Sequence, residues 1–194
     1  MPGSEPSELR TERLVLRPFR ADDAGAFARY ADDEDYRRYL SPTHPGPKEY
    51  VAHKLAADWS VERPWVITLD GTIVGSVFLG INSEDDAAEL ACLVAPAFWG
   101  RQIAFEASSA AVEHAFLSLE LSKVVARSDS RHEASIRLMM RCPSVAVQML
   151  LWNARRYRSK RAHVNFATVL TCGRRRSAAS RRTCSARARK RTTT

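Results

Sequence analysis

An almost uninterrupted apolar stretch at residues 87–95 is followed, after a short turn, by a long amphipathic segment at residues 103–119. Glu89 is the one charged residue in the apolar stretch, which is typical of a strand buried on both faces of a sheet. The second segment has the pattern of a helix that lies on a sheet, with one polar side marked by Glu106, Ser109 and Glu113. Together they predict a strand, a turn and a covering helix, and therefore an α/β type of domain.

The segments before residue 80 add a strand, two helices and a hairpin. Alternating residues predict a strand at 12–19. A helix capped by Asp22 follows, with an apolar stripe at Ala24, Phe27, Ala28 and Ala31, and a second helix carries Val51, Leu55 and Trp59 at four-residue steps. Strand-like runs at 65–69 and 72–79 are joined by Asp70-Gly71, a dipeptide that favours a tight hairpin turn.

A short strand at 123–127 and a short helix at 134–140 complete the pattern. The expected order is therefore strand, two helices, three strands, helix, strand and helix. Between them, Cys92, Cys142, Cys172 and Cys184 are widely spaced, so the sequence predicts neither a disulfide framework nor a metal site.

The net charge of +8 combines two unlike regions. Residues 1–133 hold 14 Lys and Arg against 22 Asp and Glu, a balance of −8, whereas residues 134–194 hold 16 basic residues and no acid. We therefore expect a flexible amino terminus at 1–8, an acidic domain at 9–141, a segment at 142–173 with one or two strands, and a basic, disordered tail at 174–194. The strand candidates in the third segment are 145–151 and 164–170.

The amino terminus has no apolar segment of the secretory kind, and the apolar runs are shorter than the roughly 18 residues of a spanning helix. We expect a cytoplasmic protein without a membrane partner.

The turn at residues 98–104 is the strongest local indication of a ligand site. A helix that begins directly after a strand presents unpaired backbone N–H groups and the positive end of its dipole, which favours phosphate binding. Gly100 and Ala104 are small enough for a bulky ligand to approach the backbone closely, and Arg101 can add a charged hydrogen bond to it. The alternative is an ordinary glycine-containing turn of an α/β domain, since many such turns bind nothing.

Three separated motifs resemble the GNAT N-acetyltransferases of the RimJ/RimL type, in the correct order over about residues 8–141. The first resembles that family's first strand and helix start, and consists of residues 9–19 with Asp22-Asp23. The second resembles its acetyl-CoA segment, and consists of residues 88–90, 94–96, 99–101 and 104–107. The third resembles the helix that follows, at residues 133–139.

The resemblance implies a mixed, mostly antiparallel sheet flanked by helices and splayed between the strands at 89–95 and 123–127, with acetyl-CoA in the gap. The main-chain groups of Leu93 and Val94 would bind the pantetheine arm. The backbone from Gly100 through Arg101, Gln102 and Ile103 to Ala104 would bind the pyrophosphate. The implied reaction is direct acetyl transfer to a primary amine, without a metal, by a monomer or homodimer.

Two residues are candidates for proton transfer. Glu89 is the lone carboxylate of its apolar strand, and if it faces the cleft, desolvation should raise its pKa and make it a general base. The alternative is that Glu89 faces solvent or pairs with an arginine. Ser135 matches the position of a residue that protonates the leaving thiolate in family members, although a serine near a helix start often only caps or packs.

The chain departs from the family pattern at three places. Gln102 stands where the family turn usually has glycine, and a side chain there can crowd the pyrophosphate or impose an unsuitable backbone. His132 stands where an asparagine of the family often contacts the cofactor. We expect His132 either to make a weaker cofactor contact or to have only a structural role. After Met139 the family's closing segment is replaced, and the change matches what a shifted reading frame in a GC-rich gene would produce. A gene sequence whose alternative frames encode no family-like ending would exclude this hypothesis.

The leading functional prediction is therefore acetyl transfer from acetyl-CoA to a protein amino terminus or a small-molecule amine, impaired if the carboxy terminus is aberrant. A different class remains open: the +16 segment could bind nucleic acid or ribosomes non-specifically and with strong salt dependence. It could also bind the acidic domain of another copy. The sequence does not specify the acceptor amine.

Overall fold

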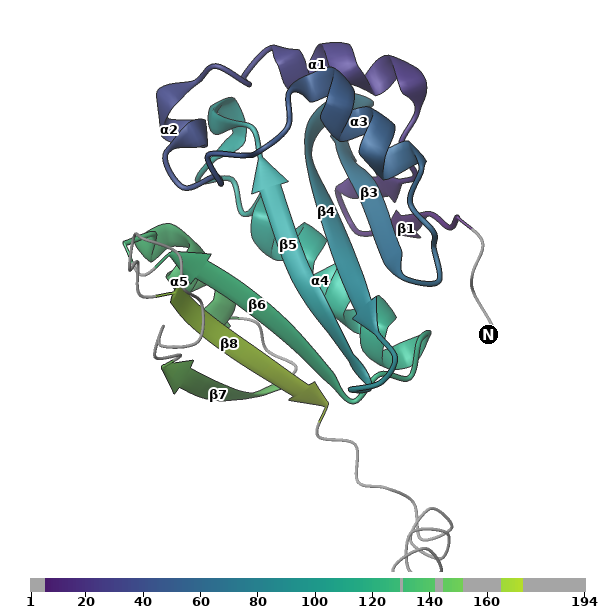
Figure 1. Cartoon of the computed structure of the whole chain (residues 1–194), viewed down its shortest axis with the longest axis vertical. Helices are drawn as coiled ribbons and strands as arrows, with labels where there is room; N and C mark the ends of the chain where they lie inside the picture. The colour runs from purple at the N-terminus through teal and green to yellow at the C-terminus, as the bar shows by residue number, and fades with distance from the viewer. Residues whose placement is uncertain (1–5, 130, 142–144, 152–164, 173–194) are drawn as a thin grey trace, which may run out of the picture.

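The computed structural model describes residues 6–129, 131–141, 145–151 and 165–172, the last two segments by their backbone alone. Within these residues the strands form one eight-stranded sheet in the order β1-β2-β3-β4-β5-β6-β8-β7 (Figure 1). The strands are β1 (Leu9–Arg10), β2 (Leu14–Arg17), β3 (Glu62–Leu69), β4 (Thr72–Asn82), β5 (Ala87–Val94), β6 (Lys123–Asp129), β7 (Val145–Leu151) and β8 (Asn165–Cys172). All neighbouring pairs are antiparallel except β5 and β6, which confirms the expected mixed, mostly antiparallel sheet.

Helices cover both faces of the sheet. They are the 3₁₀ turns η1 (Ala21–Asp23) and η2 (Pro96–Phe98), and the α-helices α1 (Ala24–Ala28), α2 (Glu34–Arg37), α3 (Pro47–Leu55), α4 (Ile103–Leu117) and α5 (Glu133–Arg141). In Figure 1, α1 and α3 lie in front of the sheet and α4 lies behind it. Among the described residues, no helix combines the length and apolarity needed to cross a membrane.

The hairpin of β3 and β4 confirms the prediction made from Asp70-Gly71. Both residues lie in the left-handed region, with φ of 49° and 76°, and Leu69 pairs directly with Thr72. Consecutive positive φ values match the right-handed twist of the flanking strands. The strands extend beyond the predicted 65–69 and 72–79, because residues 62–64 of β3 pair with β4 and residues 80–82 of β4 pair with β5.

Two hydrophobic clusters fill the two faces. The larger lies between the sheet and α4 and includes Leu16, Trp65 and Ala111. The smaller lies under α1 and α3 and consists of Phe19, Phe27, Tyr50, Val51 and Val66.

The predicted apolar stripes of the first two helices are only partly correct. Phe27 is buried, but α1 ends at Ala28, and a separate helix α2 follows because the Asp33 carboxylate accepts the Tyr36 N–H (2.9 Å). In the second helix Leu55 is 46% exposed, and Trp59 lies beyond the end of α3 and packs against Trp65 in the larger cluster. The prediction continued the helical spacing to Trp59, but α3 ends at Leu55.

The first strand is also shorter than predicted. Instead of one strand at 12–19, the chain forms β1, a turn in which the Thr11 N–H donates to the Leu14 carbonyl (3.0 Å), and β2. The predicted cap Asp22 makes no such bond. Asp23 fills that role, because its carboxylate accepts the Arg20 N–H (2.7 Å) at the start of η1.

The parallel contact between β5 and β6 is short. It joins residues Ala87 to Leu90 with Lys123 to Ala126, and beyond these residues the two strands diverge (Figure 1). The expected splay is therefore confirmed. The expectation that residues 87–95 are buried on both faces is wrong for the second half of β5, because the open edge leaves residues 91–93 only partly buried.

Both strands expected after residue 141 are present in the backbone. β8 pairs with β6 along its whole length, and β7 pairs with β8 at the edge of the sheet. The expected basic tail at 174–194, residues 1–5 of the amino terminus expected to be flexible (1–8), Cys142 and Cys184 lie outside the described residues.

Candidate functional site

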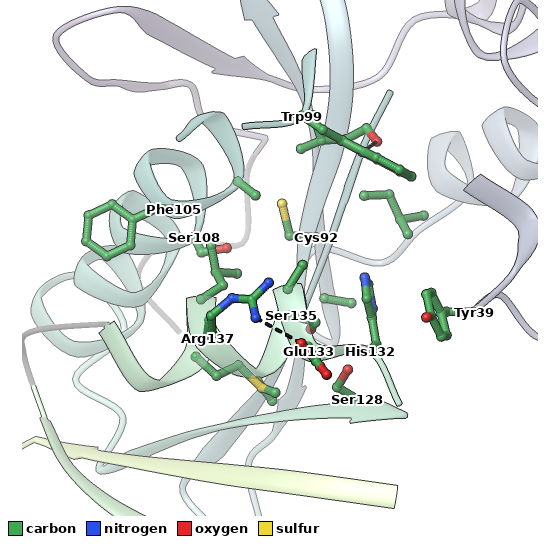
Figure 2. A pocket seen from close by; sticks show the side chains of 18 of the residues that line it. Tyr39, Cys92, Trp99, Phe105, Ser108, Ser128, His132, Glu133, Ser135 and Arg137 are labelled. Carbon is green, nitrogen blue, oxygen red and sulfur yellow. Dashed lines mark hydrogen bonds and ion pairs between the residues drawn. The ribbon is translucent and has the colours of Figure 1, made fainter. Parts of the chain in front are cut away.

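The diverging ends of β5 and β6 enclose a pocket with a volume of about 1060 Å³. Its walls are the second half of β5 with the start of α4, the end of β6 with α5, and the segment from α2 to Leu40. Figure 2 shows Phe105 on one side of the view, Tyr39 and His132 on the other, and Cys92 and Ser135 between them. The volume lies at the top of the range for small-molecule sites, so this pocket is the candidate site.

The wall formed by β5 offers unpaired backbone groups. The Ala95 N–H donates to the Val74 carbonyl (2.9 Å), and hydrogen-bonded and non-bonded pairs alternate along an antiparallel ladder. Cys92 and Val94 therefore direct their N–H and C=O groups away from β4, toward the open edge. The Trp99 indole N–H already donates to the Val94 carbonyl (2.7 Å).

This register corrects one predicted contact. Leu93 lines the pocket, but it pairs with Ser76 in the bonded phase of the ladder, so its main-chain groups face β4. The backbone groups that a ligand can reach in its place belong to Cys92. Val94 keeps its N–H for a ligand, while its carbonyl is taken by Trp99.

The start of α4 has the backbone geometry expected of an anion site. Gly100 has φ of 74° and Gln102 has φ of 64°, and the Gln102 side chain does not cap the helix. The first backbone N–H groups of the helix lack intrahelical partners and carry the positive end of the dipole. Gly100, Gln102, Ile103 and Ala104 all line the pocket, as expected.

Arg101 does not supply the expected charge inside the pocket. Its guanidinium stacks over the Phe98 ring (5.3 Å), and the residue is not part of the lining. Arg141, at the end of α5, lies at the start of α4 instead: it donates to the Gln102 side-chain oxygen (3.4 Å) and covers the Phe105 ring (5.4 Å). No sequence pattern indicated Arg141 as a site residue, because only the tertiary fold brings α5 against α4.

Replacing Gln102 with glycine is expected to raise the free energy of unfolding by about 1 kcal/mol. A left-handed backbone costs a residue with a Cβ roughly this much, and glycine avoids the cost. Gln102→Ala is the control, because it removes the amide but keeps the Cβ. Urea unfolding measures both variants, and an equal gain for alanine would contradict the backbone explanation.

Glu89 does not lie where a desolvated base was expected. The lining includes its neighbour Leu90 but not Glu89 itself. Its side chain is 48% exposed and forms an ion pair with Arg127 of β6. The expectation of a carboxylate desolvated in the cleft is therefore wrong, and the alternative of an arginine partner is confirmed.

Ser135 and His132 do line the pocket, at the start of α5. Within the described residues the Ser135 hydroxyl has no hydrogen-bond partner, so it is free to donate to a ligand. His132 stacks in parallel on Tyr39, with ring centroids 4.1 Å apart and planes 11° apart. Tyr39 was not predicted, since it lies outside the three family-like motifs.

The electrostatics of the pocket are set by ion pairs and burial. Asp35, Asp129 and Glu133 each pair with an arginine, at 2.6 Å, 2.7 Å and 3.1 Å. Burial raises the pKa of the Cys92 thiol to about 12 and lowers the pKa of His132, which Asp129 partly offsets. At neutral pH Cys92 is therefore a protonated thiol and His132 a neutral imidazole.

The residues that build this pocket coincide with a family match. The model of the acetyltransferase (GNAT) domain matches residues 13–143. Among curated sequences, the chain is similar to the uncharacterised N-acetyltransferase YoaA of Bacillus subtilis, with 29% identity over 144 residues, 69% of this chain and 80% of YoaA.

Two solved structures show the same fold. The GNAT-family acetyltransferase of Bacillus anthracis has a TM-score of 0.72 at 18% identity, covering 85% of this chain and 98% of that one. RimJ of Mycobacterium smegmatis, solved in complex with CoA-disulfide, has a TM-score of 0.71 at 21% identity and covers 95% of each chain. Because the family model spans more than half of the sequence, including every described residue that lines the pocket, the chain belongs to the GNAT family of N-acetyltransferases.

Proposed function

We propose that this protein transfers the acetyl group of acetyl-CoA to a primary amine, either a protein amino terminus or a small-molecule amine. The observation that carries the proposal is the pairing of two backbone features in one pocket: the open edge of β5 and the uncapped start of α4. The first suits an extended amide chain, and the second suits phosphate groups. Acetyl-CoA, the co-substrate of the family, carries both.

The residues present fit such a ligand. Cys92 and Val94 present backbone groups for the pantetheine amides, beside a lining that is largely apolar. The N–H groups at the start of α4 and the Arg141 guanidinium would bind phosphate. Within the described residues Arg141 has no ion pair, whereas the other arginines of the lining do, so its charge is available.

The pocket must also manage protons. Acetyl-CoA supplies a thioester as acyl donor. The protein's part is to hold the thioester beside the amine, accept the proton that an ammonium group must lose, and return a proton to the departing sulfur. We assign protonation of the departing sulfur to Ser135, because its hydroxyl lies in the lining and has no hydrogen-bond partner among the described residues.

The segment after residue 141 should affect the amine more than the cofactor. Every described residue that lines the pocket precedes residue 142, including those to which we assign the cofactor contacts. We infer that an aberrant carboxy terminus would lower turnover while leaving acetyl-CoA binding intact.

Thermal unfolding tests the cofactor site directly. At a concentration 100 times its Kd, acetyl-CoA should stabilise the protein by about 2.7 kcal/mol, a rise in Tm of roughly 5 to 10 °C. ATP at the same concentration is the control, since it shares adenine and phosphates but lacks the pantetheine arm. A Tm that acetyl-CoA does not raise more than ATP does would contradict the proposal. CoA release with a panel of peptides and small amines then identifies the acceptor.

A further inference from the structure

We propose that His132 is the base that accepts the proton of the acceptor amine, a role that rests on the acetyl transfer proposed above. His132 lies between β6 and α5, three residues before the proposed proton donor Ser135, and both residues line the pocket (Figure 2). The sequence pattern predicted a cofactor contact at this position, whereas the present inference assigns the imidazole to the acceptor amine.

The imidazole is held from two directions. Tyr39, which follows α2, stacks on its face at 4.1 Å and donates its hydroxyl to the Arg131 carbonyl (3.4 Å). Two backbone hydrogen bonds fix His132. Its N–H donates to the Asp129 backbone carbonyl (2.9 Å), and its carbonyl accepts the Ile136 N–H (3.1 Å). A base that must meet one particular proton needs this kind of fixed position.

The ring nitrogens are free to accept that proton. Neither has a hydrogen-bond partner within the described part of the chain, and burial lowers the pKa of the imidazole. The charged and titratable groups around it are Asp129 on β6, Arg131 in the loop, Glu133 and Arg137 on α5, and Tyr39. The two arginines and two acids among them form ion pairs with one another: Arg131 with Asp129, and Arg137 with Glu133.

The other candidate groups are less suitable. Each described acid of the lining forms an ion pair with an arginine, and Glu89 lies outside the lining. Burial raises the pKa of Tyr36 and of the Cys92 thiol to about 12, so both stay protonated at neutral pH. His132 is the one imidazole in the described lining.

The proton balance is complete without another reactant. His132 takes one proton from the ammonium form of the amine, which frees the nitrogen lone pair, and later releases that proton to solvent. The nitrogen then forms a bond to the acetyl carbon as the carbon–sulfur bond breaks. The second proton of the nitrogen is passed to the thiolate, with the Ser135 hydroxyl as the relay.

The test compares wild type with His132→Asn, which keeps a polar side chain of similar size. If His132 is the base, kcat should fall about 100-fold or more, while the KM for acetyl-CoA stays within about threefold. The rise of kcat with pH in the wild type should follow the titration of His132 and be lost in the variant. If His132 only contacts the cofactor, the variant should keep its kcat and change that KM, which would overturn the inference.

Two further measurements separate the possible failures. The acetyl-CoA-induced rise in Tm shows that His132→Asn is folded, and NMR titration of labelled histidines gives the pKa of His132 without any turnover. A wild-type kcat profile whose midpoint does not match the pKa of His132 overturns the inference. Cofactor binding by wild type without turnover of any amine overturns the proposed function instead. Tyr39→Ala removes the ring that stacks on the imidazole and should lower kcat.

Discussion

Replacing Asp23 with alanine is expected to lower the free energy of unfolding by about 3 to 5 kcal/mol, the usual cost of removing one partner of a buried ion pair. Asp23 is 2% exposed and accepts two hydrogen bonds from the Arg17 guanidinium, at 2.7 Å and 3.0 Å. It also accepts the Arg20 N–H (2.7 Å). The truncation would leave the Arg17 cation, whose side chain is 15% exposed, without its carboxylate.

Asp22→Ala is the matched control for this experiment. The two acids are adjacent in sequence and equal in charge, but Asp22 is exposed, and its loss should change the free energy of unfolding by no more than about 0.5 kcal/mol. Urea unfolding followed by circular dichroism measures both. If both variants lost a similar free energy of unfolding, the stabilisation would come from negative charge near η1 and not from the buried hydrogen bonds of Asp23.

Replacing Gly75 with alanine is expected to cost about 3 kcal/mol, or roughly 10 °C in Tm. An added Cβ would overlap the Leu93 carbonyl oxygen and lie 3.0 Å from the Cα of Val94. Both contacts are backbone atoms of β5, so no rotamer change can relieve them. β4 and β5 would have to separate at the point where β5 presents its open edge.

The effect of Gly75→Ala should extend to the cofactor site. The substitution would displace Leu93 and Val94, and Val94 and the adjacent Cys92 present the backbone groups proposed to bind the cofactor. The variant is therefore expected to lose most of the Tm rise that acetyl-CoA produces in the wild type. Gly75→Ala should therefore lower both the stability and the binding of acetyl-CoA, whereas a core substitution far from the pocket should lower the stability alone.

Gly80→Ala provides the control on the same strand. Its added Cβ would approach only the Glu89 carbonyl, at 3.9 Å, which is ordinary van der Waals contact. We expect its free energy of unfolding to stay within about 1 kcal/mol of wild type, with the acetyl-CoA response intact. Equal destabilisation of both variants would mean that any glycine replacement in β4 is harmful and would contradict the steric explanation.

Local chemistry predicted much of the fold. The Asp70-Gly71 turn, the strand β5 and the helix α4 were correct because each depends on neighbours in sequence. Of the three residues expected on the polar side of α4, only Glu113 is exposed, because Glu106 binds Thr11 and Arg13 and Ser109 is partly buried. The failures had a common cause. The break after α1 and the choice of Asp23 over Asp22 depend on particular side-chain hydrogen bonds, of Asp33 to the Tyr36 N–H and of Asp23 to Arg17 and Arg20, which hydrophobic periodicity does not contain. The end of α3 at Leu55 likewise has no signal in the periodicity.

The candidate site shows the same division. Gly100, Gln102, Ile103 and Ala104 were placed correctly because a helix start binds anions through its own backbone. Glu89 was misjudged because Arg127, its partner, comes from another strand. The main-chain direction of Leu93 depends on the register with β4, and the stacking of Tyr39 on His132 joins two loops far apart in sequence.

The sequence by itself determined which segments form strands and helices around residues 65–119, and that a phosphate-binding turn follows the central strand, since turn chemistry and hydrophobic spacing act over a few residues. Only the tertiary structure decided how the site is completed. The short parallel contact of β5 and β6 opens the pocket, and the packing of α5 brings Arg141 to one side of it and His132 to the other. Side chains from different segments acquire a common function only through the packing that brings them together.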